Sequence, residues 1–156
     1  MSTVDQWFSE YAESHQHPTN KLIHWICVPL IFWSILALLY SIPVPSWISD
    51  SIEGYNWSYI VVFAAYIYYL RLSIPLSLGI AIFVIACYLI IFSLEKTGLS
   101  ISVIAFSVFV LAWIGQFIGH KIEGKKPSFL KDLQFLLIGP VWLLHFIYKK
   151  LNISYT

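Results

Sequence analysis

Charged side chains are scarce in this sequence, at 11% of its 156 residues, whereas an average soluble domain carries about 25%. The formal net charge of +1 argues against the extended basic surface of a nucleic-acid-binding protein, so we expect no nucleic-acid partner. Hydrophobic residues supply 59% of the chain, and the mean hydropathy is +0.77. This composition predicts an integral membrane protein, in which aromatic residues fit the membrane interfaces.

Cysteine and the common hydrolase motifs are also scarce or missing. Cys27 and Cys87 lie inside apolar stretches, where a thiol behaves as a small hydrophobic group, so neither a disulfide framework nor a cysteine-rich metal site is expected. No Ser-His-Asp arrangement, phosphate-binding loop or HExxH helix is present, which argues against nucleophilic hydrolysis and nucleotide chemistry. The first 21 residues contain neither a basic leader nor a cleavage site, so we expect no removable signal peptide.

Long apolar runs dominate the rest of the chain. Four of them are predicted to be membrane-spanning helices: residues 22–42, 57–70, 72–94 and 99–119. A helix needs about 20 apolar residues to cross the hydrocarbon core, so the second run is short. Arg71 separates it from the third run, which predicts a tight hairpin with Arg71 at a membrane interface. A buried hairpin of a soluble protein is the alternative.

A fifth apolar segment, residues 133–148, is interrupted by Gly139 and Pro140. Its length of about 16 residues is marginal for a span, so we expect it to be broken, re-entrant or interfacial. The sequence thus predicts an all-α integral membrane helical bundle with about four to five transmembrane segments, formed as a single domain over residues 1–156.

Residues 3–15 predict a short amphipathic helix ahead of the first span. Its apolar positions are Val4, Trp7, Phe8 and Tyr11, and its acidic positions are Asp5, Glu10 and Glu13. This spacing is typical of a helix that lies on a membrane or on the bundle, and Pro18 marks the break that follows it.

Four crossings would return the chain to the side of the membrane on which it starts. Basic residues are concentrated on that side: Lys21, Arg71, Lys121, Lys125, Lys126 and Lys131, against Lys96 on the other side, with Lys149 and Lys150 depending on the last segment. Because cytoplasmic loops carry an excess of lysine and arginine, we expect the N-terminus in the cytoplasm. The same count puts four of the five histidines at one membrane face, namely His15, His17, His24 and His120.

The end of the fourth span carries a polar face, in the string WIGQFIGHKIEGKKP. Gln116, His120 and Glu123 stand at positions i, i+4 and i+7, hence on one side of a helix. Gly115 and Gly119 are small enough to let another helix approach closely. An imidazole near a hydrocarbon boundary is costly unless it has a partner, which makes His120 a candidate functional residue.

The histidines together predict a metal centre. The candidate ligands are His15, His24, His120 and His145, and the groups expected to support them or to contact a substrate are Tyr11, Asn20, Gln116 and Glu123. Three or four neutral imidazoles without cysteine suit iron, zinc or copper. Taken singly, each of these side chains could instead be a helix cap, a solvated loop residue or a buried group bonded to a carbonyl. His17 is expected to face water, and His145 joins the others only if the last segment dips and returns.

Two stretches, HQHPTNKLIHWICVP and WIGQFIGHKIEGKKPSFLKDLQFLLIGPVW, resemble the membrane-bound 2-hydroxy fatty acid dioxygenase family, first known from fungal phytosphingosine breakdown. The resemblance implies a multi-span membrane enzyme that uses Fe(II) and O2 for the α-oxidation of 2-hydroxy fatty acids to fatty acids shortened by one carbon. The positions that match the family residue by residue are His15, His24, His120, Pro18, Asn20, Gln116 and Gly119.

The chain departs from the fungal pattern in two places. The link that follows His120 is one residue shorter, and His145 stands near a position where fungal members carry a glutamate. These differences resemble a bacterial branch, which implies the bacterial inner membrane. The implied substrate would lie among membrane lipids with its acyl tail between the spans, against aromatic walls such as Trp25, Trp113 and Phe117.

Two functions of other classes remain open. A non-catalytic transporter or scaffold could use the histidines as a proton or metal path, but the sequence shows neither the internal repeats nor the mid-span charges that are common in transporters. A zinc-dependent lipid hydrolase could use the same imidazoles.

Overall fold

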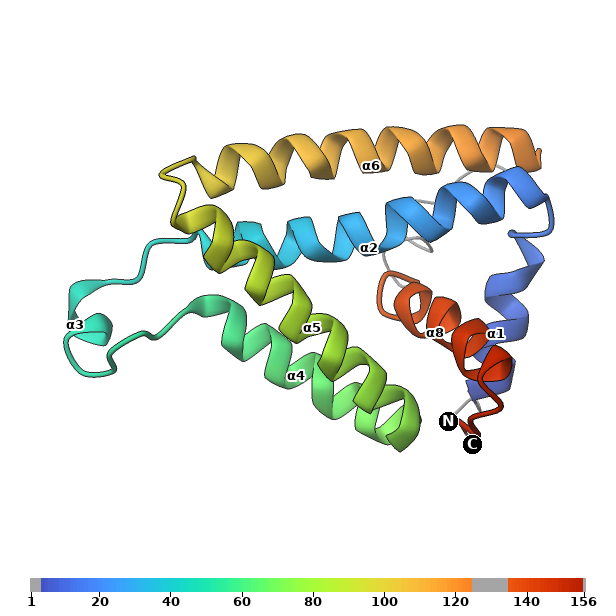
Figure 1. Ribbon diagram of the computed structural model, residues 1–156, viewed down its shortest axis with the longest axis horizontal. Helices are drawn as coiled ribbons and strands as arrows, with labels where there is room; N and C mark the ends of the chain where they lie inside the picture. Colours follow the sequence, from blue (N-terminus) through green and yellow to red (C-terminus); the bar gives the residue numbers. More distant parts are fainter. Residues whose placement is uncertain (1–3, 125–134, 156) are drawn as a thin grey trace.

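The computed structural model describes residues 4–124 and 135–155, and every regular element in these residues is a helix. In chain order the helices are α1 (Val4–Glu13), α2 (Pro18–Tyr40), α3 (Ser46–Ser49), α4 (Trp57–Leu72), α5 (Ile74–Glu95), α6 (Ile101–Glu123) and α8 (Ile138–Lys150). The four longest helices run alternately in opposite directions, and α1 and α8 lie together at one end of the molecule (Figure 1). The predicted all-α fold class is confirmed.

Three of these helices, α2, α5 and α6, are long and apolar enough to cross a membrane, and α4 is a shorter apolar helix. Large hydrophobic side chains cover their outward faces, for example Phe63, Ile82 and Leu111 at 68%, 70% and 68% exposure. Water-soluble monomers rarely expose contiguous apolar surface of this extent. The chain is therefore a helical membrane protein, as its composition predicts.

The two helices that carry His24 and His120 extend about one turn beyond their apolar runs. α2 begins at Pro18, and the side chain of His17 accepts a hydrogen bond from the Thr19 N–H at 3.2 Å. Proline is favoured at the first helical position because an N–H there would have no intrahelical acceptor. α6 ends at Glu123 and is capped by Gly124, whose φ of 73° is a left-handed conformation that glycine adopts readily. Polar turns therefore project from both helices at the same end of the molecule.

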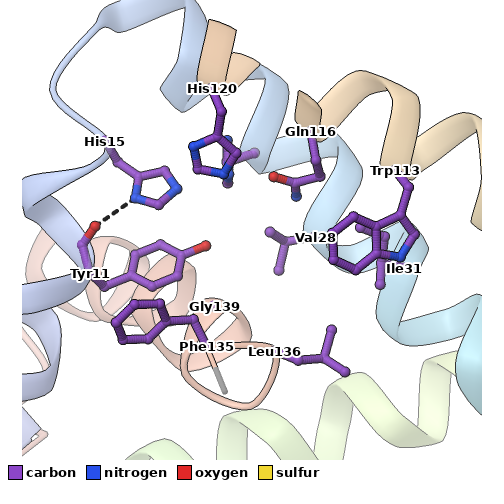
Figure 2. Close-up of a pocket in the computed structure, with 11 residues that line it drawn as sticks. Tyr11, His15, Val28, Ile31, Trp113, Gln116, His120, Phe135, Leu136 and Gly139 are labelled. Atoms are coloured by element: carbon purple, nitrogen blue, oxygen red, sulfur yellow. Dashed lines mark hydrogen bonds between the residues drawn. The ribbon is translucent and has the colours of Figure 1, made fainter. Parts of the chain in front are cut away.

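α2 and α6 pack side by side in opposite directions along most of their length (Figure 1). The two glycines of α6 permit this contact, because a Cβ atom on Gly115 would lie 2.6 Å from Cys27 Sγ and one on Gly119 would overlap Asn20 Oδ1. The prediction that these glycines allow a close helix approach is confirmed. The contact brings His120 of α6 against the loop between α1 and α2 (Figure 2).

α4 and α5 form a hairpin with a single residue, Ser73, between them. The Ser73 hydroxyl accepts a hydrogen bond from the Leu76 N–H at 3.2 Å, and Pro75 occupies the first turn of α5. Ser73 is extended, with φ −167° and ψ 122°, so the chain turns at this residue, and Pro75 is tolerated because the first N–H groups of a helix have no intrahelical acceptor. Arg71 lies exposed in the last turn of α4, in the tight connection that the sequence predicts.

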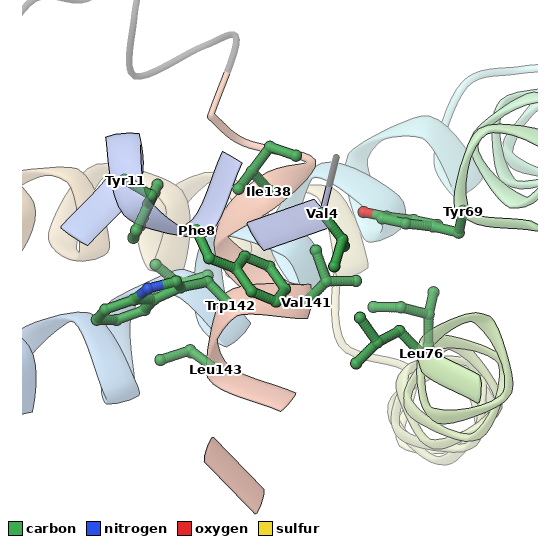
Figure 3. Packing of buried hydrophobic residues seen from close by; sticks show 11 residues of the cluster. Val4, Phe8, Tyr11, Tyr69, Leu76, Ile138, Val141, Trp142 and Leu143 are labelled. Atoms are coloured by element: carbon green, nitrogen blue, oxygen red, sulfur yellow. The ribbon is translucent and has the colours of Figure 1, made fainter. Parts of the chain in front are cut away.

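α1 and α8 pack against each other across the ends of α2, α4 and α5 (Figure 1). Figure 3 shows Val4 and Phe8 of α1 beside Val141 and Trp142 of α8, with Tyr69 of α4 nearby. The acidic residues of α1 are exposed on its opposite face. The N-terminal helix is therefore amphipathic, as predicted, and its apolar face lies on the bundle.

α8 has 13 residues and is too short to cross the hydrocarbon core of a bilayer. Gly139 and Pro140, expected to interrupt the last segment, lie instead in the first turn of this helix. Proline is tolerated there because the first N–H groups of a helix have no intrahelical acceptor. Residues 133–134 of the expected segment lie outside the described residues.

Candidate metal centre

Three histidines meet where α1, α2 and α6 come together (Figure 2). His15 lies in the loop after α1, His24 in the second turn of α2 and His120 in the last turn of α6. One ligand nitrogen of each lies within 4.8 Å of those of the other two. The three side chains are buried, with exposed fractions of 2%, 1% and 5%. The fold thus gathers imidazoles from both ends of the sequence into one compact group.

Hydrogen bonds to the backbone orient two of the three imidazoles. His24 Nδ1 lies 2.9 Å from the carbonyl oxygen of Asn20, and His15 Nδ1 lies 2.6 Å from that of Tyr11, the bond dashed in Figure 2. Because a carbonyl can only accept, Nδ1–H donates in each bond, and Nε2 carries the lone pair of the neutral ring. Metal-binding histidines commonly donate their second nitrogen in this way, which fixes the ring and raises its basicity.

Asn20 joins the loop after α1 to the ends of both helices. Its side-chain Nδ2 donates to the carbonyl oxygen of Ser14 at 3.1 Å and to Glu123 Oε2 at 3.0 Å. Its backbone carbonyl accepts the hydrogen bond from His24. Asn20 therefore positions His24 directly and holds the residue that precedes His15.

Glu123 anchors the same loop to the end of α6. Its Oε1 accepts a hydrogen bond from the Gln16 N–H at 2.7 Å, and its Oε2 accepts one from the His17 N–H at 2.9 Å. Hydrogen bonds to a carboxylate are stronger than those between neutral groups. Since Gln16 and His17 directly follow His15, Glu123 holds the backbone that presents this imidazole.

Gln116 lies one turn before His120 on α6 and is buried, with 6% of its surface exposed. Its side chain makes a hydrogen bond with His24. A neutral amide adds a polar contact beside the imidazoles without adding charge. The predicted face formed by Gln116, His120 and Glu123 is therefore turned toward α2 and the loop that precedes it.

A cavity of about 30 Å³ lies in front of the imidazoles. Besides the three histidines it is lined by Tyr11, Val28, Ile31, Trp113, Gln116, Phe135, Leu136 and Gly139. This volume is about that of one water molecule in the liquid, so the space accepts a small ligand or one end of a larger one. Most of its walls are apolar and would limit the entry of bulk water.

Aromatic rings close the side of the site that faces α8. The Tyr11 ring stacks on His15 with centroids 4.2 Å apart and an interplanar angle of 4°. Trp142 packs on both, with centroids 4.9 Å from Tyr11 and 5.5 Å from His15. The sequence alone does not mark Trp142 as part of the site, because an apolar residue on a hydrophobic helix cannot be distinguished from a core residue by its spacing.

His145, the fourth predicted ligand, is not part of this group. Its Nδ1 contacts the carbonyl oxygen of Trp142, and its ring stacks on Phe8 with centroids 4.6 Å apart. Burial lowers the pKa of the His145 imidazole, which favours its neutral form. His145 therefore packs as an aromatic side chain between α1 and α8.

The other side chains singled out from the sequence lie in different surroundings. His17 is exposed, as predicted, and caps α2. Trp113 lines the small cavity, whereas Trp25 and Phe117, expected as acyl-chain walls, are 38% and 42% exposed on the outer surface. Lys125, expected near the cytoplasmic face, lies outside the described residues.

A sequence model of the family described as 2-hydroxy-palmitic acid dioxygenase Mpo1-like matches residues 1–151. The chain belongs to this family. Within the Mpo1-like family, it is similar to the 2-hydroxy-palmitic acid dioxygenase MPO1 of Saccharomyces cerevisiae, with 28% identity over 144 residues, covering 89% of this chain and 76% of the yeast protein. No solved structure matches the chain. The family resemblance carried by the two histidine-containing stretches is confirmed.

Proposed function

We propose that this protein is an Fe(II)-dependent dioxygenase that converts 2-hydroxy fatty acids into fatty acids one carbon shorter. The observation that carries the proposal is the buried three-histidine group, within a chain that matches the Mpo1-like family over residues 1–151. The family name supplies the reaction and substrate class. The site supplies donors for a metal ion.

The proposed reaction balances with one molecule of O2. The carbon that bears the hydroxyl group becomes the carboxyl carbon of the product, and the original carboxyl group leaves as carbon dioxide. The atoms balance when the products are the shortened acid, carbon dioxide and one molecule of water. No further reductant is required.

The donor set fits a borderline divalent metal ion. His15, His24 and His120 would hold it, because neutral imidazoles suit iron or zinc, whereas the hard ions magnesium and calcium prefer oxygen donors. When bound there, iron would supply the chemistry with O2 that protein side chains do not provide.

The surrounding residues would position the donors and exclude water. The carbonyl oxygens of Tyr11 and Asn20 hold two imidazole rings, and Glu123 holds the loop that carries the first of them. Tyr11 and Trp142 cover His15 on the side of α8. Such a rigid, apolar enclosure protects a reactive site from side reactions with water.

The polar end of the substrate would lie in the small cavity. Gln116 lines this cavity and offers both a hydrogen-bond donor and an acceptor to a hydroxyl or carboxylate group. Lys21 in the first turns of α2 and Lys121 in the last turn of α6 add positive charge at the same end of the molecule, which would attract a carboxylate from the membrane surface.

The proposal is tested by purifying the protein in detergent and measuring its metal content, its O2 uptake with 2-hydroxypalmitate and the product by mass spectrometry. Stoichiometric iron, O2 consumption that requires the substrate, and pentadecanoate as product are expected. Non-hydroxylated palmitate is the matched control and should consume no O2.

Two other outcomes would contradict the proposal. Zinc without O2 uptake, together with hydrolysis of an ester lipid, would favour a lipid hydrolase, since three histidines also form catalytic zinc sites. A protein that folds normally but retains no metal would favour a transporter or scaffold.

A further inference from the structure

A second and larger cavity, of about 330 Å³, lies between α2, α4 and α5. Its walls are mainly apolar and include Phe32 and Ile35 of α2, Val62 and Ala65 of α4, and Ile80 and Ala81 of α5. Tyr69 also lines it, but the Tyr69 hydroxyl already donates a hydrogen bond to the carbonyl oxygen of Leu137 at 2.9 Å. The volume lies in the range of small-molecule sites, and such walls suit an apolar ligand better than water.

Leu136 lines both cavities, so it lies between them. Val28 and Ile31 of α2 line the small cavity, and Ile35, one turn further along, lines the large one. The cavities therefore follow one another along one face of α2. Figure 2 shows Leu136 on the side of the small cavity opposite His15, so a chain leaving the histidines in this direction reaches Leu136 first.

Two other sides of the three-histidine site are covered by the chain itself. Tyr11 and Trp142 pack on His15 on the side of α8. The loop held by Glu123 covers the polar end of α6. Leu136 therefore stands between the site and an apolar space of sufficient size, and a chain that passes this side chain would enter that space.

We infer that the large cavity receives the acyl chain of the substrate while its 2-hydroxy carboxylate end lies at the three histidines. This inference rests on the proposed function and adds to it the part of the protein that selects acyl length. Since lipid tails are as apolar as the cavity, moving the chain out of the bilayer gains little hydrophobic energy. Selection should therefore arise from the space available, because the walls exclude chains that do not fit.

Filling the cavity tests this directly. Ala65→Phe and Ala81→Phe place a ring in the cavity, whereas Ala64→Phe and Ala86→Phe place the same ring on the exposed surface of the same helices. The cavity variants should lower kcat/KM for 2-hydroxypalmitate about tenfold or more, the range over which pocket shape discriminates between substrates. Activity on 2-hydroxyoctanoate should fall much less, and the surface variants should keep the wild-type preference.

A second variant changes the cavity in the opposite sense. Phe32→Ala enlarges it and should shift the preference toward longer 2-hydroxy acids. Bound iron and thermal unfolding are measured for every variant, so that a loss of folding is distinguished from a change of preference. Equal length profiles in the cavity and surface variants would overturn the inference and leave the proposed function intact.

Photo-crosslinking tests occupancy without catalysis. A 2-hydroxy fatty acid with a diazirine at its methyl end should label peptides of α4 and α5, and Ala65→Phe should reduce this labelling while Ala64→Phe should not. Excess 2-hydroxypalmitate should compete, and excess phosphatidylcholine should not. Labelling that phospholipid displaces equally well, or labelling elsewhere, would overturn the inference. If the wild type oxidises no 2-hydroxy acid, the proposed function fails, and this labelling still decides what the cavity binds.

Discussion

At the scale of single residues, the site uses one arrangement twice. His15 and His24 each bond through Nδ1 to the carbonyl oxygen four residues earlier, from Tyr11 and Asn20. For His24 these two positions lie one above the other in α2, whereas His15 makes the same bond from the loop that directly follows α1. Each ring is thus oriented by the backbone of its own segment. Because the acceptor is a backbone carbonyl oxygen, replacing the side chain of Tyr11 or Asn20 does not directly remove the hydrogen bond.

Alanine at His15, His24 or His120 should lower bound metal by more than about tenfold, the loss seen when an outer partner of a metal site is removed. Two histidines outside the group serve as controls. His17→Ala removes an exposed helix cap and should cost about 1 kcal/mol of stability with no loss of metal. His145→Ala should lower stability and leave the metal per folded molecule unchanged. The amount of metal bound per folded molecule is measured for each variant. Loss of metal in the His145→Ala variant would show that His145 belongs to the site.

Glu123 acts on the site through the loop that it holds. Glu123→Gln keeps the size of the side chain but removes the charge and one acceptor for the Gln16 and His17 N–H groups. Metal affinity should fall about 10-fold to 100-fold, as for other outer partners of metal sites. Metal titration measures this, and Glu13→Gln, an exposed carboxylate on α1, is the control. If the two variants bind the metal with equal affinity, Glu123 does not support the site.

At the scale of helices, the α2–α6 contact depends on residues without side-chain bulk. Cys27 Sγ occupies the space that a Cβ atom on Gly115 would need. Asn20 Oδ1 likewise occupies the space that a Cβ atom on Gly119 would need. The same contact sets the spacing between His24 and His120, whose ring centroids are 5.1 Å apart. Helix packing therefore sets the geometry of the three-histidine group.

Gly115→Ala should destabilise the protein by about 1–3 kcal/mol through overpacking and should weaken metal binding. Cys27→Ala removes the atom that the new methyl group meets, so the double variant should recover most of the loss. Thermal unfolding of both single variants and the double variant gives the coupling energy. Additive effects in this cycle would show that the two side chains do not meet.

The sequence predicted the helices well but not all of their ends. Apolar content marks the interior of a span, whereas Pro18 and Gly124 begin and end the helices through backbone preferences outside the apolar run. His120 was identified because it shares a helical face with other polar groups. His145 was predicted as a fourth ligand but lies apart from the other three histidines. The direction of its side chain depends on how α8 packs on α1, and residue spacing in the sequence gives no information about that packing. The role of Leu136 and the large cavity could not be predicted from the sequence, because residues that line an apolar cavity have the same sequence pattern as residues of a packed core.

At the scale of the whole molecule, the alternating directions of α2, α4, α5 and α6 bring the two ends of the chain together (Figure 1). Among the described basic residues, Lys21 and Lys121 lie at the end that holds the histidines, and Lys96 lies in the connection between α5 and α6 at the other end. We therefore propose that the histidine end faces the cytoplasm.

Cysteine labelling tests this orientation, because the native Cys27 and Cys87 are both buried. A membrane-impermeant maleimide applied to the non-cytoplasmic side should modify Thr97→Cys and should spare Glu10→Cys, two exposed positions near opposite ends of the bundle. Permeabilised membranes, in which both should react, provide the control. Labelling of both positions from one side would contradict an odd number of crossings between residues 10 and 97, which α2, α4 and α5 would provide.

The long separation in sequence between His24 and His120 also affects the order of biosynthesis. A nascent chain that has released only its first half from the ribosome presents two of the three imidazoles of the group, and the third arrives with α6. The carboxylate of Glu123, which ties down the loop of His15, arrives at the same time. Loading of a redox-active ion would thus have to wait until translation and insertion of the bundle are nearly complete, so that partly made chains do not expose such an ion to oxygen.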